Sequence, residues 1–266
     1  MLDPRERIKS LMGRVRQSEP LPASTQVVAE TFERLGYLVS STAPSQVIDR
    51  FDEMLRTVWE ETLVTLEQYE DRSYSQGIPR EFIREFPEAF DTAGEVSRRE
   101  GFGAGVTRLF SELYPMFRRA FLSVQQGRMA RGGKDFELQI EGLFDLAKIP
   151  YHRQESEHHT DLILPSLTLH ESNRTISAVV SVKRTLRERW AEVAEELFNL
   201  RSPNVFLFTA DENVSENHVS RICGQYNIYL VVWDRVKTRK FPESPLVLGY
   251  TEWATKRLSV LREYWT

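Results

Sequence analysis

The residues most able to perform chemistry lie in one stretch, from Asp161 to Glu196. Asp161 opens an apolar run typical of a strand, DLILP, and Lys183 closes the next such run, ISAVVSVK. An arginine-rich segment follows directly, and then an amphipathic helical pattern that carries several glutamates, Glu196 among them. Carboxylates suit Mg²⁺, which prefers oxygen ligands, and a lysine supplies a compact positive charge that can orient an attacking water. This combination predicts metal-dependent cleavage of a phosphodiester.

Asp161 and Lys183 can act together only if their strands are neighbours. Two helical patterns interleave with the short apolar runs that follow Pro150, and those runs are typical of buried strands: residues 161–165, 176–182, 204–209 and 228–233. A polar turn joins the first two runs, so we expect a hairpin that brings Asp161 to Lys183. Helical crossovers join the later runs. The pattern predicts an α/β fold with a mixed sheet and helices on both faces.

The N-terminal half has a different pattern, with apolar residues at helical spacing from Arg5 to about Gly127. We expect a loop over residues 71–82, which contain a glycine and Pro79, and a kink or interruption at Pro115. The expected division is a helical part, residues 1–125, and an α/β part, residues 126–266, that contains Asp161 and Lys183.

Composition limits the class of protein. The chain has 266 residues and a single cysteine, Cys223, which excludes an intrachain disulfide and fits a reducing cytoplasm. No signal peptide precedes the first charges, and no apolar run approaches the roughly 20 residues that span a bilayer. The formal net charge of −4 argues against a protein that coats nucleic acid indiscriminately. It leaves DNA binding open, because the local field of a cleft decides that.

The spacing of the acid and the lysine resembles the D(x)n(E/D)xK signature of the PD-(D/E)xK nuclease superfamily. Two positions depart from it: Thr160 replaces the usual proline, and Ser181 stands where the second acid is expected. The EcoRII/PspGI/SsoII-like members, the CCGG branch of restriction endonucleases, have a small residue there and carry the acid on the next helix, thirteen residues after the lysine. The resemblance makes Glu196 that acid, with Glu192, one turn earlier, as the alternative.

Four further residues are candidates by the same resemblance. RMARGGKDFELQIEGLF resembles the branch's segment that carries a glutamate before the first strand, which makes Glu137 the matching residue. Gln126, eleven residues earlier, resembles a glutamine that contacts the minor groove, although Gln125 fits equally well. Some members stack flipped bases on a tryptophan, for which Trp59, with Arg56 nearby, is the candidate. Trp59 also lies on an apolar helical stripe, so core packing is the alternative.

The most specific part of the resemblance is KRTLRERW. In SsoII-like enzymes an Arg-Glu-Arg triplet at this distance from the lysine reads the CC/GG half-site, which implies Arg187, Glu188 and Arg189 here. Arginine can bind guanine O6 and N7 together, and glutamate can accept from the N4 amino group of cytosine. Salt bridges to the helix glutamates are the alternative role for the two arginines.

The resemblance implies a type II restriction endonuclease with a PD-(D/E)xK catalytic core, residues 126–266, and an N-terminal helical subdomain, residues 1–125, that contributes to dimerisation and DNA contacts. It would act with Mg²⁺, as a homodimer in a prokaryotic cytoplasm, on double-stranded DNA at a palindromic CC(N)GG-type site, and leave 5′ overhangs. In that role Asp161 and Glu196 hold the metal, Lys183 positions the attacking water and Glu137 supports the site. A repair or junction-resolving nuclease and a catalytically dead DNA-binding regulator are the alternatives. The sequence leaves open the core (CCGG, CCNGG or CCWGG), flipping of the central pair, and pairing of dimers.

Overall fold

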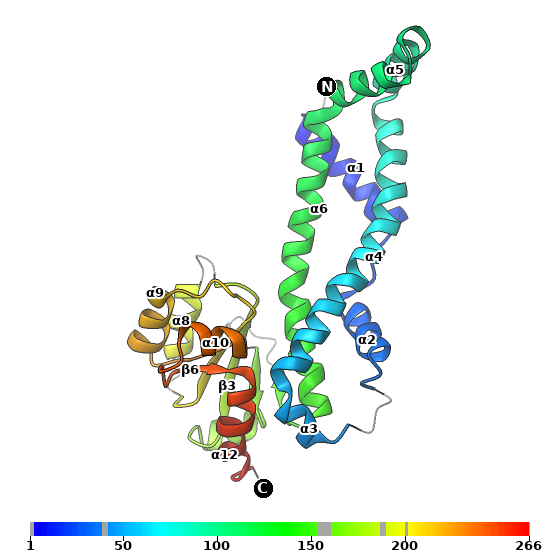
Figure 1. Ribbon diagram of the computed structural model, residues 1–266. Helices are drawn as coiled ribbons and strands as arrows, with labels where there is room; N and C mark the ends of the chain where they lie inside the picture. Colours follow the sequence, from blue (N-terminus) through cyan, green and yellow to red (C-terminus); the bar gives the residue numbers. More distant parts are fainter. Residues whose placement is uncertain (1–2, 39–41, 154–160, 187–189, 200–201, 266) are drawn as a thin grey trace. The chain divides into compact units, whose positions relative to one another are not determined.

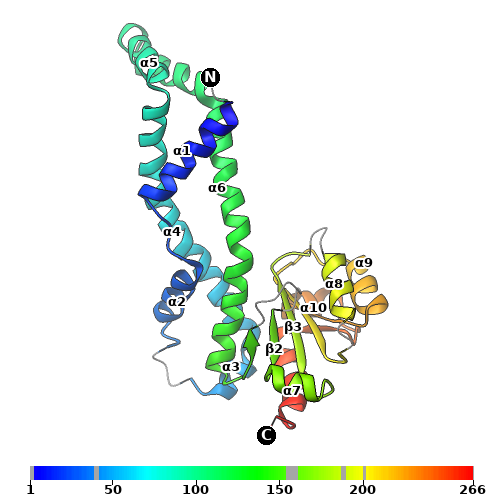
Figure 2. The ribbon, with the colours of Figure 1, turned by 180° about the vertical axis from the view of Figure 1, so that it is seen from behind.

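The structure is a computed structural model that describes residues 3–38, 42–153, 161–186, 190–199 and 202–265, with the side chains of residues 4 and 190–193 excepted (Figures 1 and 2). It divides into two compact units. We call Met1–Val27 with Leu63–Arg131 the helical unit, and Val28–Thr62 with Gly132–Thr266 the sheet unit. Residues 28–62 therefore belong with the sheet, so the compact units do not follow a single boundary along the chain.

The helical unit is built from α1 (Pro4–Ser18), the start of α2 (Ser24–Arg34), the second part of α4 (Phe51–Glu85), α5 (Pro87–Glu100) and the first part of α6 (Phe102–Leu146). In both views α1 lies beside α4 and α6 (Figures 1 and 2). Apolar side chains from these helices form a core of their own: Ile8, Leu11, Met12, Val15, Ile78, Phe82, Ala89, Leu113 and Ala120.

The loop predicted for residues 71–82 is wrong, because α4 runs unbroken through Pro79. The interruption allowed for at Pro115 is also absent, since α6 is one helix from Phe102 to Leu146. A proline inside a helix costs about 3 kcal/mol. Near both prolines, residues of the same helix are buried in the core of the helical unit, Ile78 near Pro79 and Leu113 near Pro115, and this packing offsets the cost. Gly77 permits the close approach of α1: a Cβ on it would lie 2.8 Å from Cγ1 of Val15.

The sheet unit contains the predicted mixed sheet. Its six strands follow in chain order: β1 (His152–Arg153), β2 (Leu162–Leu164), β3 (Ala178–Lys183), β4 (Val205–Thr209), β5 (Tyr229–Val232) and β6 (Val247–Gly249). The pairs β1–β2 and β2–β3 are antiparallel, and the later pairs are parallel. The predicted hairpin of the first two long runs is thus confirmed, with a short helix, α7 (Leu167–Ser172), in place of a simple turn. The sequence did not predict β1 and β6.

Helices flank this sheet. The crossovers are α8 (Trp190–Asn199), α9 (Glu216–Val219) with the π-helical turn Ser220–Gln225, and α10 (Asp234–Lys240); the chain ends in α11 (Tyr250–Glu252), a second π-helical turn (Trp253–Arg257) and α12 (Leu258–Arg262). The short helix α3 (Pro44–Asp49) and the first part of α4 also belong to this unit. Every residue of β4 is buried, as expected for a parallel strand covered on both faces. Within the described chain, no helix is both long and apolar enough to span a bilayer.

Candidate active site

Asp161 and Lys183 meet at one end of the β2–β3 pair. The backbone N–H of Asp161 donates to the carbonyl of Val180 at 3.1 Å, which continues the antiparallel pairing one residue beyond β2. Lys183 is the last residue of β3. Its Nζ lies 3.1 Å from Oδ2 of Asp161, and both side chains remain partly exposed, at 26% and 20%. The structure therefore holds this acid and this cation together where solvent and a ligand can reach them.

Two further groups hold the Asp161 carboxylate in place. The backbone N–H of Val182 donates to Oδ2 at 2.6 Å, and the hydroxyl of Ser181 donates to the same oxygen at 3.2 Å. Hydrogen bonds to a charged acceptor are short and orienting. Ser181 is fully buried and occupies the position where the second acid is usually found. Here it orients the Asp161 carboxylate through its hydroxyl. Among the described residues nothing donates to Oδ1, which leaves that oxygen available to a cation.

Glu137 belongs to the same cluster. It lies on the part of α6 that belongs to the sheet unit, and Lys134 donates to its Oε2 at 2.9 Å. Burial raises the pKa of Glu137, and the charge of Asp161 raises it further, while Lys134 and Lys183 lower it. The opposing influences of Asp161 and Lys183 mean that all three groups share one local field.

Glu196 lies on α8, the helix that follows β3, and its side chain is partly exposed. Within the described part of the chain, no three His, Cys, Asp or Glu side chains converge as a metal site. The assignment of Glu196 as a metal ligand therefore stays a prediction. The side chain of Glu192, its alternative, lies outside the described residues.

Trp59 is packed in the core of the sheet unit and remains partly exposed. Its ring meets that of Phe136 edge-on, with centroids 5.4 Å apart. The guanidinium of Arg184 lies over the Trp59 ring, 5.3 Å from its centroid, and Gly132 makes room for it, because a Cβ there would overlap Nη1 of Arg184. No pattern in the sequence predicts this contact. The packing role of Trp59 is thus observed, and its role in base stacking stays a prediction.

A family model described as EcoRII C terminal matches residues 98–245 of this chain. The chain belongs to this family. The matched range contains Glu137, Asp161, Lys183 and Glu196, and it begins after Trp59. Among curated proteins, the type II restriction enzyme SsoII of Shigella sonnei is 29% identical over 154 residues, which cover 54% of this chain and 50% of that enzyme. The chain thus spans half the length of this relative. The predicted membership of the EcoRII/PspGI/SsoII-like branch is confirmed.

Solved structures support the same fold. Metal-depleted Ecl18kI in complex with uncleaved, modified DNA superposes with a TM-score of 0.81 at 24% identity, over 99% of this chain and 86% of that one. A complex of restriction endonuclease PspGI with substrate DNA superposes with a TM-score of 0.55 at 17% identity, over 94% of each chain. At these identities the likeness establishes the fold, a PD-(D/E)xK core, and no residue roles.

The described residues predicted to contact DNA belong to both compact units. Arg187, Glu188 and Arg189 lie outside the described residues. Gln126 and Gln125 are exposed on α6 in the helical unit, and Arg56 is partly exposed, one turn before Trp59 in the sheet unit. Their contacts with DNA stay predictions.

Proposed function

We propose that this member of the EcoRII C-terminal family is a type II restriction endonuclease that hydrolyses double-stranded DNA with Mg²⁺. The observation that carries the proposal is the 3.1 Å contact between Lys183 Nζ and Asp161 Oδ2, with Glu137 in the same field. An acid and a lysine at the open end of an antiparallel strand pair, in a chain of this family, form the minimal apparatus for phosphodiester hydrolysis.

The chemistry of the donors fits a hard cation. Mg²⁺ in enzymes is commonly bound through one or two carboxylates together with substrate phosphates, and Asp161 offers Oδ1, with Glu137 beside it. In the proposal Glu196 completes the ligand set. When bound, Mg²⁺ neutralises charge on the phosphoryl group and makes a water more acidic.

The protein residues have separate tasks in this mechanism. Ser181 and the N–H of Val182 fix the orientation of the Asp161 carboxylate, so that its free oxygen keeps one direction. Lys183 presents its ammonium group to the scissile phosphate, where it offsets the charge that accumulates in the transition state and orients the attacking water. Glu137, whose pKa is raised, gains from a cation placed near it, because positive charge favours its ionised form.

The proposed target is a palindromic CC(N)GG-type site that is cut to leave 5′ overhangs. A homodimer would present Arg187, Glu188 and Arg189 to each half-site and would place one active site on each strand. The helical N-terminal part would contribute to dimerisation and, through Gln126, to the minor-groove side. Trp59 and Arg56 would receive an extruded base. The prokaryotic cytoplasm is the proposed location.

Run-off sequencing of DNA digested in Mg²⁺ is the test, with wild type and Asp161→Ala compared at equal concentration. We expect discrete breaks at one short palindrome for wild type and none for the variant. Breaks at branched junctions or without sequence preference would indicate a repair or junction-resolving nuclease. Equal DNA binding by both proteins, without cleavage by either, would contradict the proposal and indicate a DNA-binding regulator.

A further inference from the structure

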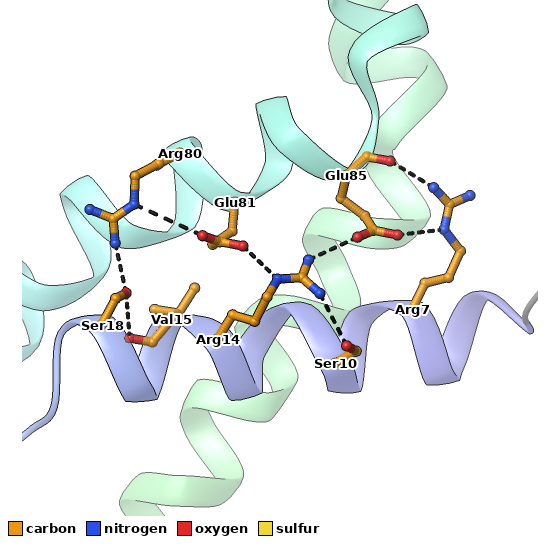
Figure 3. A network of polar contacts seen from close by, with 8 residues as sticks. All are labelled: Arg7, Ser10, Arg14, Val15, Ser18, Arg80, Glu81 and Glu85. Carbon is orange, nitrogen blue, oxygen red and sulfur yellow. Dashed lines mark hydrogen bonds and ion pairs between the residues drawn. The ribbon is translucent and has the colours of Figure 1, made fainter.

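Helix α1 carries basic side chains on two opposite faces, and only one of these faces is neutralised. On the face toward α4, Nε of Arg14 donates to Glu81 at 2.6 Å and its Nη2 donates to Glu85 at 2.8 Å. Nε of Arg7 donates to Glu85 at 2.9 Å, and Figure 3 shows the whole network. Carboxylates of α4 neutralise both arginines, and these ion pairs join α1 to α4.

The other face of α1 has Arg5, Lys9 and Arg16. At 100° per residue these three positions fall within about 40° of one another, on the side of the helix away from Arg7 and Arg14. Arg16 donates to the hydroxyl of Ser123 on α6 at 2.9 Å. Neither Arg5 nor Lys9 forms an ion pair with any carboxylate in the described chain.

This second face lines a groove between α1 and α6 with a volume of about 360 Å³. Its walls combine four cations with small polar and apolar groups and contain no described acid: Arg5, Ile8, Lys9, Arg16, Arg119, Leu122, Ser123 and Gln126. Arg119 and Gln126 are seven residues apart on α6, two helical turns, and so share a face. Like Arg5 and Lys9, Arg119 has no ion pair among the described residues.

The charge distribution identifies the class of ligand. Four cations converge in a chain whose formal net charge is −4, although acids are available nearby and neutralise the opposite face of the same helix. Unmatched like charges repel one another, and a polyanion relieves that repulsion. Cations spaced along a groove suit the evenly spaced phosphates of a nucleic acid backbone.

We propose that this basic groove binds the sugar-phosphate backbone of duplex DNA, and that Arg119 and Lys9 supply its principal phosphate contacts beside Gln126. The proposal rests on the nuclease function above and adds backbone contacts along the helical unit to the minor-groove contact proposed for Gln126. Phosphate contacts position a protein on DNA but carry no sequence information. The groove is therefore expected to raise affinity for every duplex by the same factor.

The experiment measures binding of the full chain to fluorescein-labelled duplexes by anisotropy, in Ca²⁺ and over a salt series, with one duplex that contains the cleaved site and one that lacks it. We expect Lys9→Ala and Arg119→Ala each to reduce the slope of log K against log salt by about 0.9, the value for one lost phosphate contact. Affinity for both duplexes should fall by the same factor. Arg108→Ala is the matched control, because it removes one charge from the same helix outside the groove and should leave the slope unchanged.

Three results would overturn the inference. Slopes of the groove variants equal to that of Arg108→Ala would show that no phosphate binds there. An unchanged slope with a lower dimerisation constant in sedimentation would show that the groove meets an acidic surface of a second copy. A loss confined to the site-containing duplex would indicate base reading. Two checks exclude a folding defect as the cause of a reduced slope. Lys9→Gln, which keeps a long side chain without the charge, should give the same slope as Lys9→Ala, and circular dichroism spectra of all variants should match that of wild type.

Cleavage of plasmid DNA in Mg²⁺, measured in parallel, separates this inference from the proposed function. Wild type that cuts at discrete sites, with unchanged slopes for the variants, would disprove the groove alone. Wild type that binds but does not cut would disprove the nuclease function, while the slopes would still decide the groove. Wild type that binds no duplex would contradict both.

Discussion

Two clusters of acidic and basic side chains in this chain have different roles, one structural and one at the candidate active site. In the helical unit, Arg14 is held between Glu81 and Glu85, and its hydrogen bond to Glu81 raises the pKa of its guanidinium (Figure 3). Burial raises the pKa of Glu85, but hydrogen bonds from Arg7 and Arg14 outweigh it, and the pKa falls below the ordinary value. In the active-site cluster, burial and the charge of Asp161 raise the pKa of Glu137. The helical network favours the charged forms of Arg14 and Glu85, whereas the active-site cluster disfavours the charged form of Glu137.

The difference shows why an ion pair alone does not mark a functional site. In the network of Figure 3 each carboxylate has a matching guanidinium, so adding a cation there would gain nothing. Around Asp161 two acids share the site with Lys134 and Lys183, but Oδ1 of Asp161 has no donor among the described residues and the pKa of Glu137 is raised. A divalent cation would supply a partner for that oxygen and favour the ionised form of Glu137. A carboxylate of fixed orientation with an oxygen that has no donor, partly open to solvent, is therefore the more informative signature.

The largest effect should follow from removal of the active-site cation. Lys183→Ala should lower the cleavage rate by about 10²–10⁴-fold, the range for a group that acts on the attacking water or the proton in flight. Single-turnover cleavage of a labelled duplex measures it. Lys256→Ala, which removes an exposed lysine of the sheet unit, is the control. A Lys183→Ala protein that cuts at the wild-type rate would show that the pair is structural.

The helical network should respond in the opposite way. Glu81 is buried and pairs with Arg14, so Glu81→Ala should lower the free energy of unfolding by about 2 kcal/mol while the single-turnover cleavage rate stays at its wild-type value. Urea unfolding followed by far-ultraviolet circular dichroism reports it. All five tryptophans lie in the sheet unit, so their fluorescence gives a separate reading of that unit in the same samples. A loss of cleavage without loss of stability would contradict the distinction between the clusters.

Asp52 provides an intermediate case, a buried acid with a structural role. Its Oδ1 accepts from the N–H of Asp234 at 2.8 Å, and burial raises its pKa from 3.8 to about 6, assisted by the charge of Asp234 and opposed by Arg56 and Arg235. Because the folded protein holds this proton more tightly than the unfolded chain, the contribution of Asp52 to stability falls as pH rises from about 4 to 6. A pKa change of this size amounts to about 2 to 3 kcal/mol of unfolding free energy.

Asp52→Asn should remove this dependence, since the amide oxygen can still accept from Asp234. The difference in unfolding free energy between variant and wild type, from urea titrations followed by tryptophan fluorescence, should therefore shift in favour of the variant between pH 4 and pH 7. Parallel pH profiles for the two proteins would show that Asp52 has an ordinary pKa in the folded state.

The sequence predicted those parts of the fold that depend on local patterns. The runs that became β2 and β3 could be recognised from their apolar residues, and the short connection between them made antiparallel pairing the expected outcome, which placed Asp161 beside Lys183. The strand β1 has two residues, too few for any periodicity to show, and β6 follows closely after Pro242 and Pro245, which favour an irregular segment. The helix through Pro79 could not be predicted, because its stability comes from residues of α1 far away in the sequence.

The candidate site was predictable to a similar extent. Glu137 was found through resemblance, and its distance from Asp161 depends on how α6 packs on the sheet, which no spacing encodes. The contact of Arg184 with Trp59 joins residues more than a hundred positions apart, and it depends on the missing side chain of Gly132. Long-range packing decides both, so only coordinates reveal them.

The smallest effect on stability is expected from an ion pair that is exposed to solvent. Arg108 and Glu112 lie one turn apart on α6, with side chains 55% and 38% exposed and Nη2 3.3 Å from Oε2. Water solvates both groups almost as well when they are apart, so Arg108→Ala should change the free energy of unfolding by less than about 0.5 kcal/mol. A double-mutant cycle with Glu112→Ala, measured by circular dichroism in urea at low and high salt, isolates the pair. A coupling as large as that of Glu81 with Arg14 would mean that contact distance alone sets the strength of these pairs, and that burial does not separate the clusters.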